Sequence, residues 1–222
     1  MLDIGSGRGL IWERSWDKIP QDVHIHMVDK FEGGLFHMQS FERQNRGFLK
    51  KNVRFTQQQM DVNTADLGEE MYDCVAALHM WYYIDNPQDF LSRVKKALKK
   101  KGRLCTNFNA QDLVPDLEKL LKGFSKDFSL EARMERQKKY SSIVEGALRE
   151  ACSSLTCQVY DNELHINDVE QLYRFLVETD QALGEKILKV SGDFMRYLAD
   201  YLKVEEKVVF HAHAKMFTGY FE

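Results

Sequence analysis

Glycines occupy every second position near the start of the chain, at Gly5, Gly7 and Gly9, directly after the apolar segment MLDI. Glycine adopts backbone angles that other residues avoid, so the chain can turn sharply there and let a ligand approach the main chain. A helix that begins after such a turn presents unpaired backbone amides, which suit an anionic or hydrogen-bonding ligand. The pattern therefore predicts a binding loop; a plain strand-to-helix turn without a ligand is the alternative.

Three later segments are placed so that they could contact a ligand bound beside this loop. Asp29 ends a second apolar segment about twenty residues after the glycines, where a carboxylate can accept hydrogen bonds from both ribose hydroxyls. Asp61 follows a third segment and can present a carboxylate to an adenine amino group. Residues 72–78 would close the far side of the same crevice. Each aspartate alone also fits a helix cap or a solvated loop, whereas the ordered set indicates a nucleoside.

Position 10 separates this loop from the dinucleotide fingerprint G-x-G-x-x-G, because it holds leucine in place of the third glycine. No P-loop lysine follows the glycines either. The pattern therefore disfavours a pyrophosphate ligand.

The elements that must position these residues alternate between strand and helix through the first half of the chain. Apolar segments predict strands at 1–4, 24–29, 52–59, 72–78, 102–108, 155–166 and 206–221. Helical spacing predicts helices at 87–102, 112–124, 139–152, 167–180 and 185–202, the first of them ended by Gly102. This alternation predicts an α/β fold with parallel strands and crossover helices on both faces. We expect one domain over residues 1–222, with a helical insertion after the fifth strand.

Composition narrows the class of protein. The net charge of −3 gives no basic field for nucleic acid, and no apolar run approaches membrane-spanning length. No secretory segment precedes the first strand. We therefore expect a cytoplasmic protein without a membrane or nucleic-acid partner. Cys74 and Cys105 lie in apolar strand segments, which predicts reduced thiols in the core.

Five segments, LDIGSGRG, MVDKF, QMDVN, YDCVAALHMWYYIDNP and LKKKGRLCTNF, resemble the successive motifs of class I S-adenosylmethionine-dependent methyltransferases. Within that group, LHMWYYIDNP, residues 175–179 and the closing KVVF are most similar to the histamine N-methyltransferase family. The resemblance implies a Rossmann-like, seven-stranded, mostly parallel sheet with the last strand antiparallel. It also implies S-adenosylmethionine as cofactor, bound by residues 1–108, with residues 109–222 on the substrate side.

The resemblance also assigns cofactor-binding residues, position by position. They are Asp3, Gly5, Ser6, Gly7, Asp29, Lys30, Asp61, Val62 and Leu78. Gly5 and Gly7 would line the methionine part of the cofactor, and Asp3 would fix the loop near its amino group. Asp29 would hold the ribose.

At the other end of the cofactor, Asp61 and Val62 would border the adenine, and Leu78 would touch the cofactor through its backbone. Two positions depart from the histamine enzymes. His79 replaces their glutamine and Ala212 replaces their asparagine, both at substrate-contacting positions. The resemblance therefore implies a small-amine substrate without implying histamine itself.

Methyl transfer from a sulfonium requires alignment and exclusion of water more than acid–base catalysis. His79, just after the fourth strand, is the best polar candidate: it can accept a proton or hydrogen-bond a substrate amine, or it is satisfied by a backbone carbonyl. Asn107 and Phe108 end the fifth strand and can reach the same pocket.

Three aromatic residues follow His79. Trp81, Tyr82 and Tyr83 can wall a cage for a cationic or planar substrate, with Tyr82 and Tyr83 favoured, or they can be plain core residues. We therefore predict His79, Tyr82 and Tyr83 as the catalytic set. His211 and His213 share one strand face, but no pattern completes a metal site, and we expect no metal.

The leading hypothesis is methyl transfer from S-adenosylmethionine to the nitrogen of a small amine. The alternatives are a catalytically silent relative that binds a cofactor or a partner, and a methyltransferase that acts on protein or RNA. The family normally carries helices before its first motif, and this chain begins at that motif. We therefore expect an open pocket, or one covered by the insertion at 112–150, by a second copy in a homodimer or by another partner.

Overall fold

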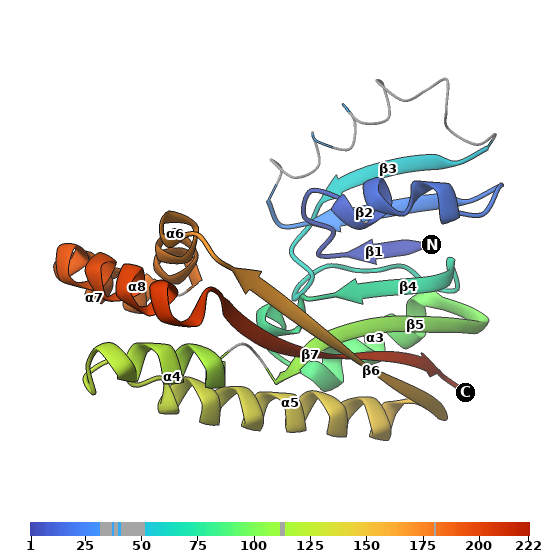
Figure 1. The fold of residues 1–222 in the computed structure, drawn as a ribbon. Coiled ribbons are helices and arrows are strands. Elements are labelled where there is room, and N and C mark those ends of the chain that lie inside the picture. The colour runs from blue at the N-terminus through green and yellow to red at the C-terminus, as the bar shows by residue number, and fades with distance from the viewer. Residues whose placement is uncertain (32–36, 38–39, 41–51, 112–113, 180) are drawn as a thin grey trace. The chain divides into compact units, whose positions relative to one another are not determined.

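The computed structural model describes residues 1–31, 37, 40, 52–111, 114–179 and 181–222. Seven strands form one sheet in the order β3-β2-β1-β4-β5-β7-β6, with β7 antiparallel to its neighbours (Figure 1). Their bounds are β1 Leu2–Ile4, β2 His24–Asp29, β3 Arg54–Gln59, β4 Tyr72–Leu78, β5 Leu98–Gln111, β6 Ser154–Ile166 and β7 Val208–Tyr220. The predicted seven-stranded, mostly parallel Rossmann-like sheet is confirmed.

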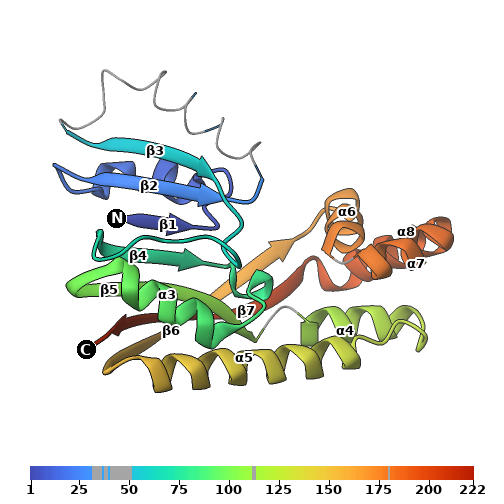
Figure 2. The same ribbon diagram turned by 180° about the vertical axis from the view of Figure 1, so that it is seen from behind.

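Helices lie on both faces of the parallel strands, as expected, and the helical elements in the described residues have the following bounds. They are α1 Leu10–Arg14, η1 Trp16–Lys18, η2 Trp81–Tyr83, α3 Pro87–Ala97, α4 Val114–Phe124, α5 Glu131–Ala151, α6 Val169–Thr179, α7 Gln181–Lys189 and α8 Ser191–Glu205. Helix α1 lies in front of β2 in Figure 1, whereas α3 lies in front of β5 in the reverse view of Figure 2. These two helices therefore cover opposite faces.

Strand β1 is short but central. Leu2, Asp3 and Ile4 pair in parallel with β2 on one side and with β4 on the other. β3 pairs with β2, and β5 with β4, also in parallel. The carboxyl ends of all five strands therefore meet at one edge, which is where ligands bind in open α/β sheets.

Helix α3 shows why the predicted boundary at Gly102 was wrong. Asn86 caps its start by accepting a hydrogen bond from the Asp89 amide, and Pro87 occupies the first turn. The helix ends at Ala97, because the carbonyls of Lys96 and Ala97 accept hydrogen bonds from the amides of the segment before β4. Residues from Leu98 onward then join β5.

The chain divides into two compact units. The first comprises Met1–Phe108, Ser141–Val159 and Lys215–Glu222, and the second comprises Asn109–Tyr140 and Tyr160–Ala214. The second unit has its own apolar core of buried side chains from α4, α6, α7, α8 and β7, with Phe194 fully buried among them. The predicted site residues all belong to the first unit.

Two helix predictions in the second half of the chain also need correction. Helix α5 begins at Glu131 and not near 139, because the carboxylate of Glu118 accepts a hydrogen bond from the Leu130 amide at 2.5 Å and fixes the start of the helix. The helix predicted at 185–202 is two helices, which break at Val190. No helix among the described residues has the length and apolar character needed to cross a membrane.

Candidate active site

The opening turn has the backbone that its glycines predict. Gly5 has φ +67° and Gly7 has φ +52°, which lie in the left-handed region that favours glycine. A Cβ on Gly5 would lie 2.8 Å from the Cβ of Met80, so the turn and the segment after β4 are in close contact. At Gly7 no heavy atom of the described residues lies within 4 Å of such a Cβ, which leaves space beside the loop in this part of the structure.

Asp29 joins this loop to the end of β2. One carboxylate oxygen accepts a hydrogen bond from the Gly7 amide at 2.8 Å, and the other accepts one from the Phe31 amide at 2.9 Å. Each oxygen keeps a second acceptor site, so the carboxylate can also receive ribose hydroxyls. The glycine loop and Asp29 therefore face each other, as the nucleoside hypothesis requires.

Asp3 lies beneath the loop with its side chain buried, and it accepts a hydrogen bond from the Trp12 indole at 2.6 Å. Burial raises the pKa of Asp3 to about 7, with a smaller contribution from the negative charge of Asp29, while the indole hydrogen bond acts in the opposite direction. A carboxyl group of this kind gains from a nearby positive charge.

Ser6 supplies the test of whether the loop fits a cofactor. Its hydroxyl oxygen is buried, and it has no hydrogen-bond partner among the residues that the structure describes. Buried polar atoms are normally satisfied, so an orphaned hydroxyl in this loop suits a polar ligand. Together with the space beside Gly7, this hydroxyl is chemically compatible with a polar group of S-adenosylmethionine.

Lys30 and Asp61 meet beside the ends of β2 and β3. The ammonium of Lys30 lies 2.9 Å from the Asp61 carboxylate. This contact with Lys30, followed by a hydrogen bond from the Asn63 amide, lowers the pKa of Asp61. Asp61 is therefore ionised at neutral pH and acts as an acceptor.

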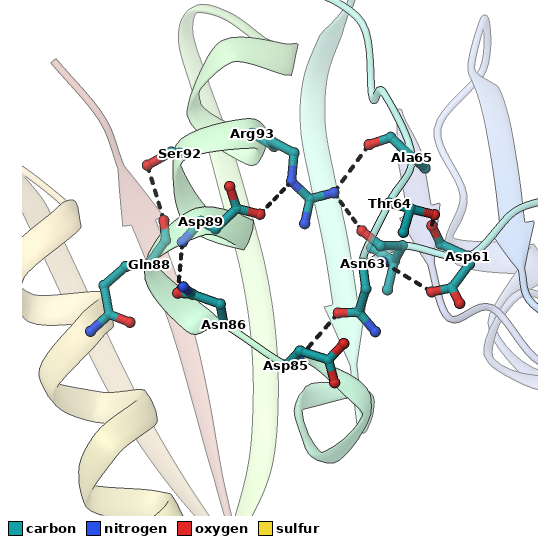
Figure 3. Close-up of polar contacts among 11 residues, drawn as sticks. Asp61, Asn63, Thr64, Ala65, Asp85, Asn86, Gln88, Asp89, Ser92 and Arg93 are labelled. Atoms are coloured by element: carbon teal, nitrogen blue, oxygen red, sulfur yellow. Dashed lines mark hydrogen bonds and ion pairs between the residues drawn. The ribbon is translucent and has the colours of Figure 1, made fainter.

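Arg93, on α3, holds the loop that follows β3 and was missed by sequence reasoning (Figure 3). Its guanidinium donates to the carbonyl oxygens of Val62, at 2.5 Å, and Ala65, at 3.1 Å. Asp89, one turn earlier on α3, accepts from the same guanidinium at 2.9 Å. The arginine sits in an ordinary helical charge pattern, and nothing in the sequence marks its carbonyl partners.

Asn63 connects the same loop to the aromatic segment after β4. Its side chain donates to the Tyr83 carbonyl at 2.8 Å. It also accepts from the Asp85 amide at 3.1 Å (Figure 3). Tyr82 and Tyr83 are 51% and 68% exposed, and their rings pack edge to face. Trp81 is fully buried against Phe90, so it is a core residue, which was the alternative given for it.

Leu78 and His79 follow at the carboxyl end of β4. Leu78 is half-buried and pairs with Asn107 of β5. His79 has φ +53° and hydrogen-bonds to Asn107 through both its backbone amide and its Nε2 atom, each at 2.8 Å. Phe108 is buried and stacks on Phe217, so the expectation that it reaches the pocket is wrong.

The histidines and cysteines considered as possible metal ligands or core thiols are accounted for by contacts with neighbouring side chains. His211 bonds to Asp116 and His213 to Asp161, and no cluster of metal-ligating side chains occurs within the described ranges. Cys74 and Cys105 are free thiols but only partly buried, with their sulfurs 3.9 Å apart.

Comparison with known proteins places this chain in a family. The family model of a methyltransferase domain matches residues 1–159. The solved YcgJ protein from Bacillus subtilis is 16% identical with a TM-score of 0.53, covering 100% of this chain and 91% of that chain. A methyltransferase assigned in Bacillus halodurans is 17% identical with a TM-score of 0.55, covering 98% and 90%.

About half of a longer enzyme has a similar fold. Phosphoethanolamine N-methyltransferase 2 from Haemonchus contortus, solved with S-adenosylmethionine, is 15% identical with a TM-score of 0.52, covering 100% of this chain and 48% of that chain. Among curated proteins, none matches the chain. The chain belongs to the methyltransferase domain family and has the fold of the class I S-adenosylmethionine-dependent enzymes.

Proposed function

We propose that this methyltransferase transfers the methyl group of S-adenosylmethionine to the nitrogen of a small amine. The observation that carries the proposal is the 2.8 Å hydrogen bond from the Gly7 amide to Asp29, which brings the glycine loop and the ribose-binding acid together. S-adenosylmethionine is the cofactor of the family, and it supplies an activated methyl group when bound.

The residues of the loop suit the parts of this cofactor. Asp3 is available to balance its positive charge, and the Ser6 hydroxyl to bond its polar end. Asp29 accepts from the ribose, and Asp61 with the Val62 backbone borders the adenine. In this proposal Lys30 helps through Asp61, whose position it fixes.

On the substrate side, Tyr82 and Tyr83 present exposed aromatic faces next to the carboxyl end of β4. Aromatic faces attract cationic and planar groups, which favours an amine. The resemblance to histamine N-methyltransferases points the same way, while His79 and Ala212 argue for a substrate other than histamine. A cytoplasmic location accompanies this proposal as a prediction.

The cofactor half of the proposal is tested by titration calorimetry. We expect Asp29→Ala to weaken S-adenosylmethionine binding by about tenfold, the scale of losing charged hydrogen bonds. Asp73→Asn is the matched control, because Asp73 is an exposed acid paired with Lys99 and away from the loop. Equal affinity in wild type and Asp29→Ala contradicts the ribose assignment.

The reaction is tested by screening small amines, phenols and carboxylates and weighing the products. Methylated amines support the proposal. If an oxygen, a protein or an RNA is methylated instead, the proposed amine substrate is wrong. If calorimetry shows no heat of S-adenosylmethionine binding, the chain is better explained as a catalytically silent relative. The same samples, sized with and without cofactor, show whether a second copy covers the site.

A further inference from the structure

Asn107 holds His79 with both ends of its side-chain amide. Its Oδ1 accepts from the His79 backbone amide at 2.8 Å, and its Nδ2 lies 2.8 Å from His79 Nε2. His79 is one of the few residues here that adopt a positive φ without being glycine. Such a conformation persists where its surroundings fix it, and this two-point contact does so.

The two contacts together determine where the imidazole carries its proton. A backbone N–H can only donate, so the atom of Asn107 that faces it must be the oxygen. The NH2 group of the same amide therefore faces His79 Nε2, and an NH2 group can only donate. Nε2 must then be the acceptor and bear no proton, which leaves the proton of the neutral ring on Nδ1.

Protonation of the whole ring is disfavoured by the same geometry. A proton on Nε2 would point at the N–H of Asn107. Partial burial of the ring also lowers the pKa of His79. At neutral pH the ring is therefore neutral, and its Nδ1–H has no partner among the described residues.

We propose that Asn107 is a positioning residue that fixes His79 as a hydrogen-bond donor, so that the substrate must present an acceptor to His79 Nδ1. This inference rests on the proposed function. It assigns His79 the role of substrate recognition and not of general base, because one ring nitrogen is engaged and the other already carries a proton.

The consequence is a substrate with two functional groups. An amine nitrogen has one lone pair, and a lone pair that accepts from Nδ1 cannot attack the methyl group. In the transfer, the lone pair of the amine nitrogen forms the N–C bond, and the electron pair of the broken S–C bond stays on sulfur. The surplus proton of the methylated amine then leaves to water. The acceptor must therefore be another atom, such as a ring nitrogen or a carbonyl oxygen.

The proton position is tested by nuclear magnetic resonance on the whole chain with ¹⁵N-labelled histidine. We expect a protonated Nδ1 and an unprotonated Nε2 for His79 at about pH 8, where the ring is neutral. Asn107→Asp should move the proton to Nε2 and raise the pKa of the ring, because a carboxylate only accepts. Asn86→Asp, which changes a helix cap into an equally good one, should leave the ring unchanged.

A protonated Nε2 in the wild type overturns the proposal, and so does an Asn107→Asp spectrum identical to wild type. These readouts need neither cofactor nor turnover. They therefore fail or succeed independently of the proposed function, which fails when calorimetry shows no cofactor binding.

The substrate half is tested with two probes of equal shape, 3-(aminomethyl)pyridine and benzylamine, which differ by one ring nitrogen. We expect the pyridine to bind about three- to tenfold more tightly, the value of one hydrogen bond, and to shift the His79 Nδ1 signal. His79→Gln, which keeps an N–H donor, should retain the preference, and His79→Leu should lose it. Equal affinities in the wild type overturn this half.

Discussion

Asp3 is a buried carboxyl group that suits a cationic ligand but lowers the stability of the ligand-free protein. Its side chain is 2% exposed, and its hydrogen bond from Trp12 offsets the loss of water incompletely, since its pKa rises to about 7. The folded state therefore holds a proton on Asp3 over a pH range in which the unfolded chain has lost it. Such residues are common at functional sites, where binding and stability favour different side chains.

The sign of the pH effect follows from linkage. The folded pKa of Asp3 lies above its unfolded value of 3.8, so this group lowers stability as pH rises from about 4 to about 7. We expect Asp3→Asn to remove this loss and raise the free energy of unfolding by about 2–4 kcal/mol at pH 8 relative to wild type. The gain should be much smaller near pH 4.

Urea unfolding followed by tryptophan fluorescence at both pH values measures this difference. Asp73→Asn, on the exposed surface, serves as the control: Lys99 lowers the pKa of Asp73, so this variant should lose and not gain stability between pH 4 and pH 8. A constant gain of Asp3→Asn across the range would contradict a raised pKa. The same variant should bind S-adenosylmethionine more weakly, because it cannot ionise.

Gly5 and Gly7 illustrate two different reasons why a position requires glycine: backbone conformation and lack of space for a side chain. Both have positive φ, but a Cβ at Gly5 would clash with Met80, whereas a Cβ at Gly7 would meet no described heavy atom within 4 Å. We expect Gly7→Ala to cost about 1 kcal/mol of stability from backbone strain, and Gly5→Ala to cost about 2–3 kcal/mol from strain plus the clash. Unfolding of both variants without cofactor makes the comparison; equal losses would show that Met80 moves aside freely.

At the scale of elements, the loop after β3 depends on a contact that no local pattern reveals. Arg93 reaches from α3 to two carbonyls of this loop, and Asn63 reaches from the loop to the segment after β4. The glycine loop could be predicted because its signal is local. The positions of Val62 and Tyr83 depend on partners about thirty and twenty residues away, respectively, as do the ends of helices such as α3.

We expect Arg93→Met to loosen this loop while leaving α3 folded. Its guanidinium makes two hydrogen bonds to carbonyls, and charged hydrogen bonds contribute about 1.5–3 kcal/mol each when lost. Hydrogen exchange of residues 60–66 should become faster, and cofactor affinity should fall about three- to tenfold. Arg149→Met is the control, because Arg149 is exposed and pairs with Glu145 within its own helix. Unchanged exchange at 60–66 would contradict the assigned role of Arg93.

At the scale of the whole molecule, the parallel strands with crossover helices followed from the alternation of segments. The seven strands with an antiparallel last strand followed from the family resemblance, and the strand order itself was not predicted. The division into two compact units was not predicted. It arises from the second apolar core, whose members are spread over residues 114–210, and periodicity in single helices does not show which helices share a core. The helix break at Val190 was not predicted for the same reason, because the helices on either side of it both contribute to that core.

Because each unit has its own apolar core, a cavity made in one core should lower the stability of that unit more than the stability of the other. Phe194 is fully buried in the second unit among Phe124, Phe128 and Tyr197, and truncating it to alanine should cost that core about 3–5 kcal/mol. The three tryptophans of the chain, Trp12, Trp16 and Trp81, all lie in the first unit. Tryptophan fluorescence therefore reports the first unit, whereas helical circular dichroism includes α4 and α6–α8 of the second.

We expect Phe194→Ala to shift the circular dichroism transition to lower urea and the fluorescence transition less. The reciprocal variant, Phe90→Ala, removes the buried ring that packs edge to face on Trp81 in the first unit, so it should shift the fluorescence transition more. Saturating S-adenosylmethionine should raise the fluorescence midpoint in both variants, since a ligand stabilises the unit that binds it. If both variants move both transitions by the same amount, the two units unfold as one, and loss of either core would then also remove the cofactor site.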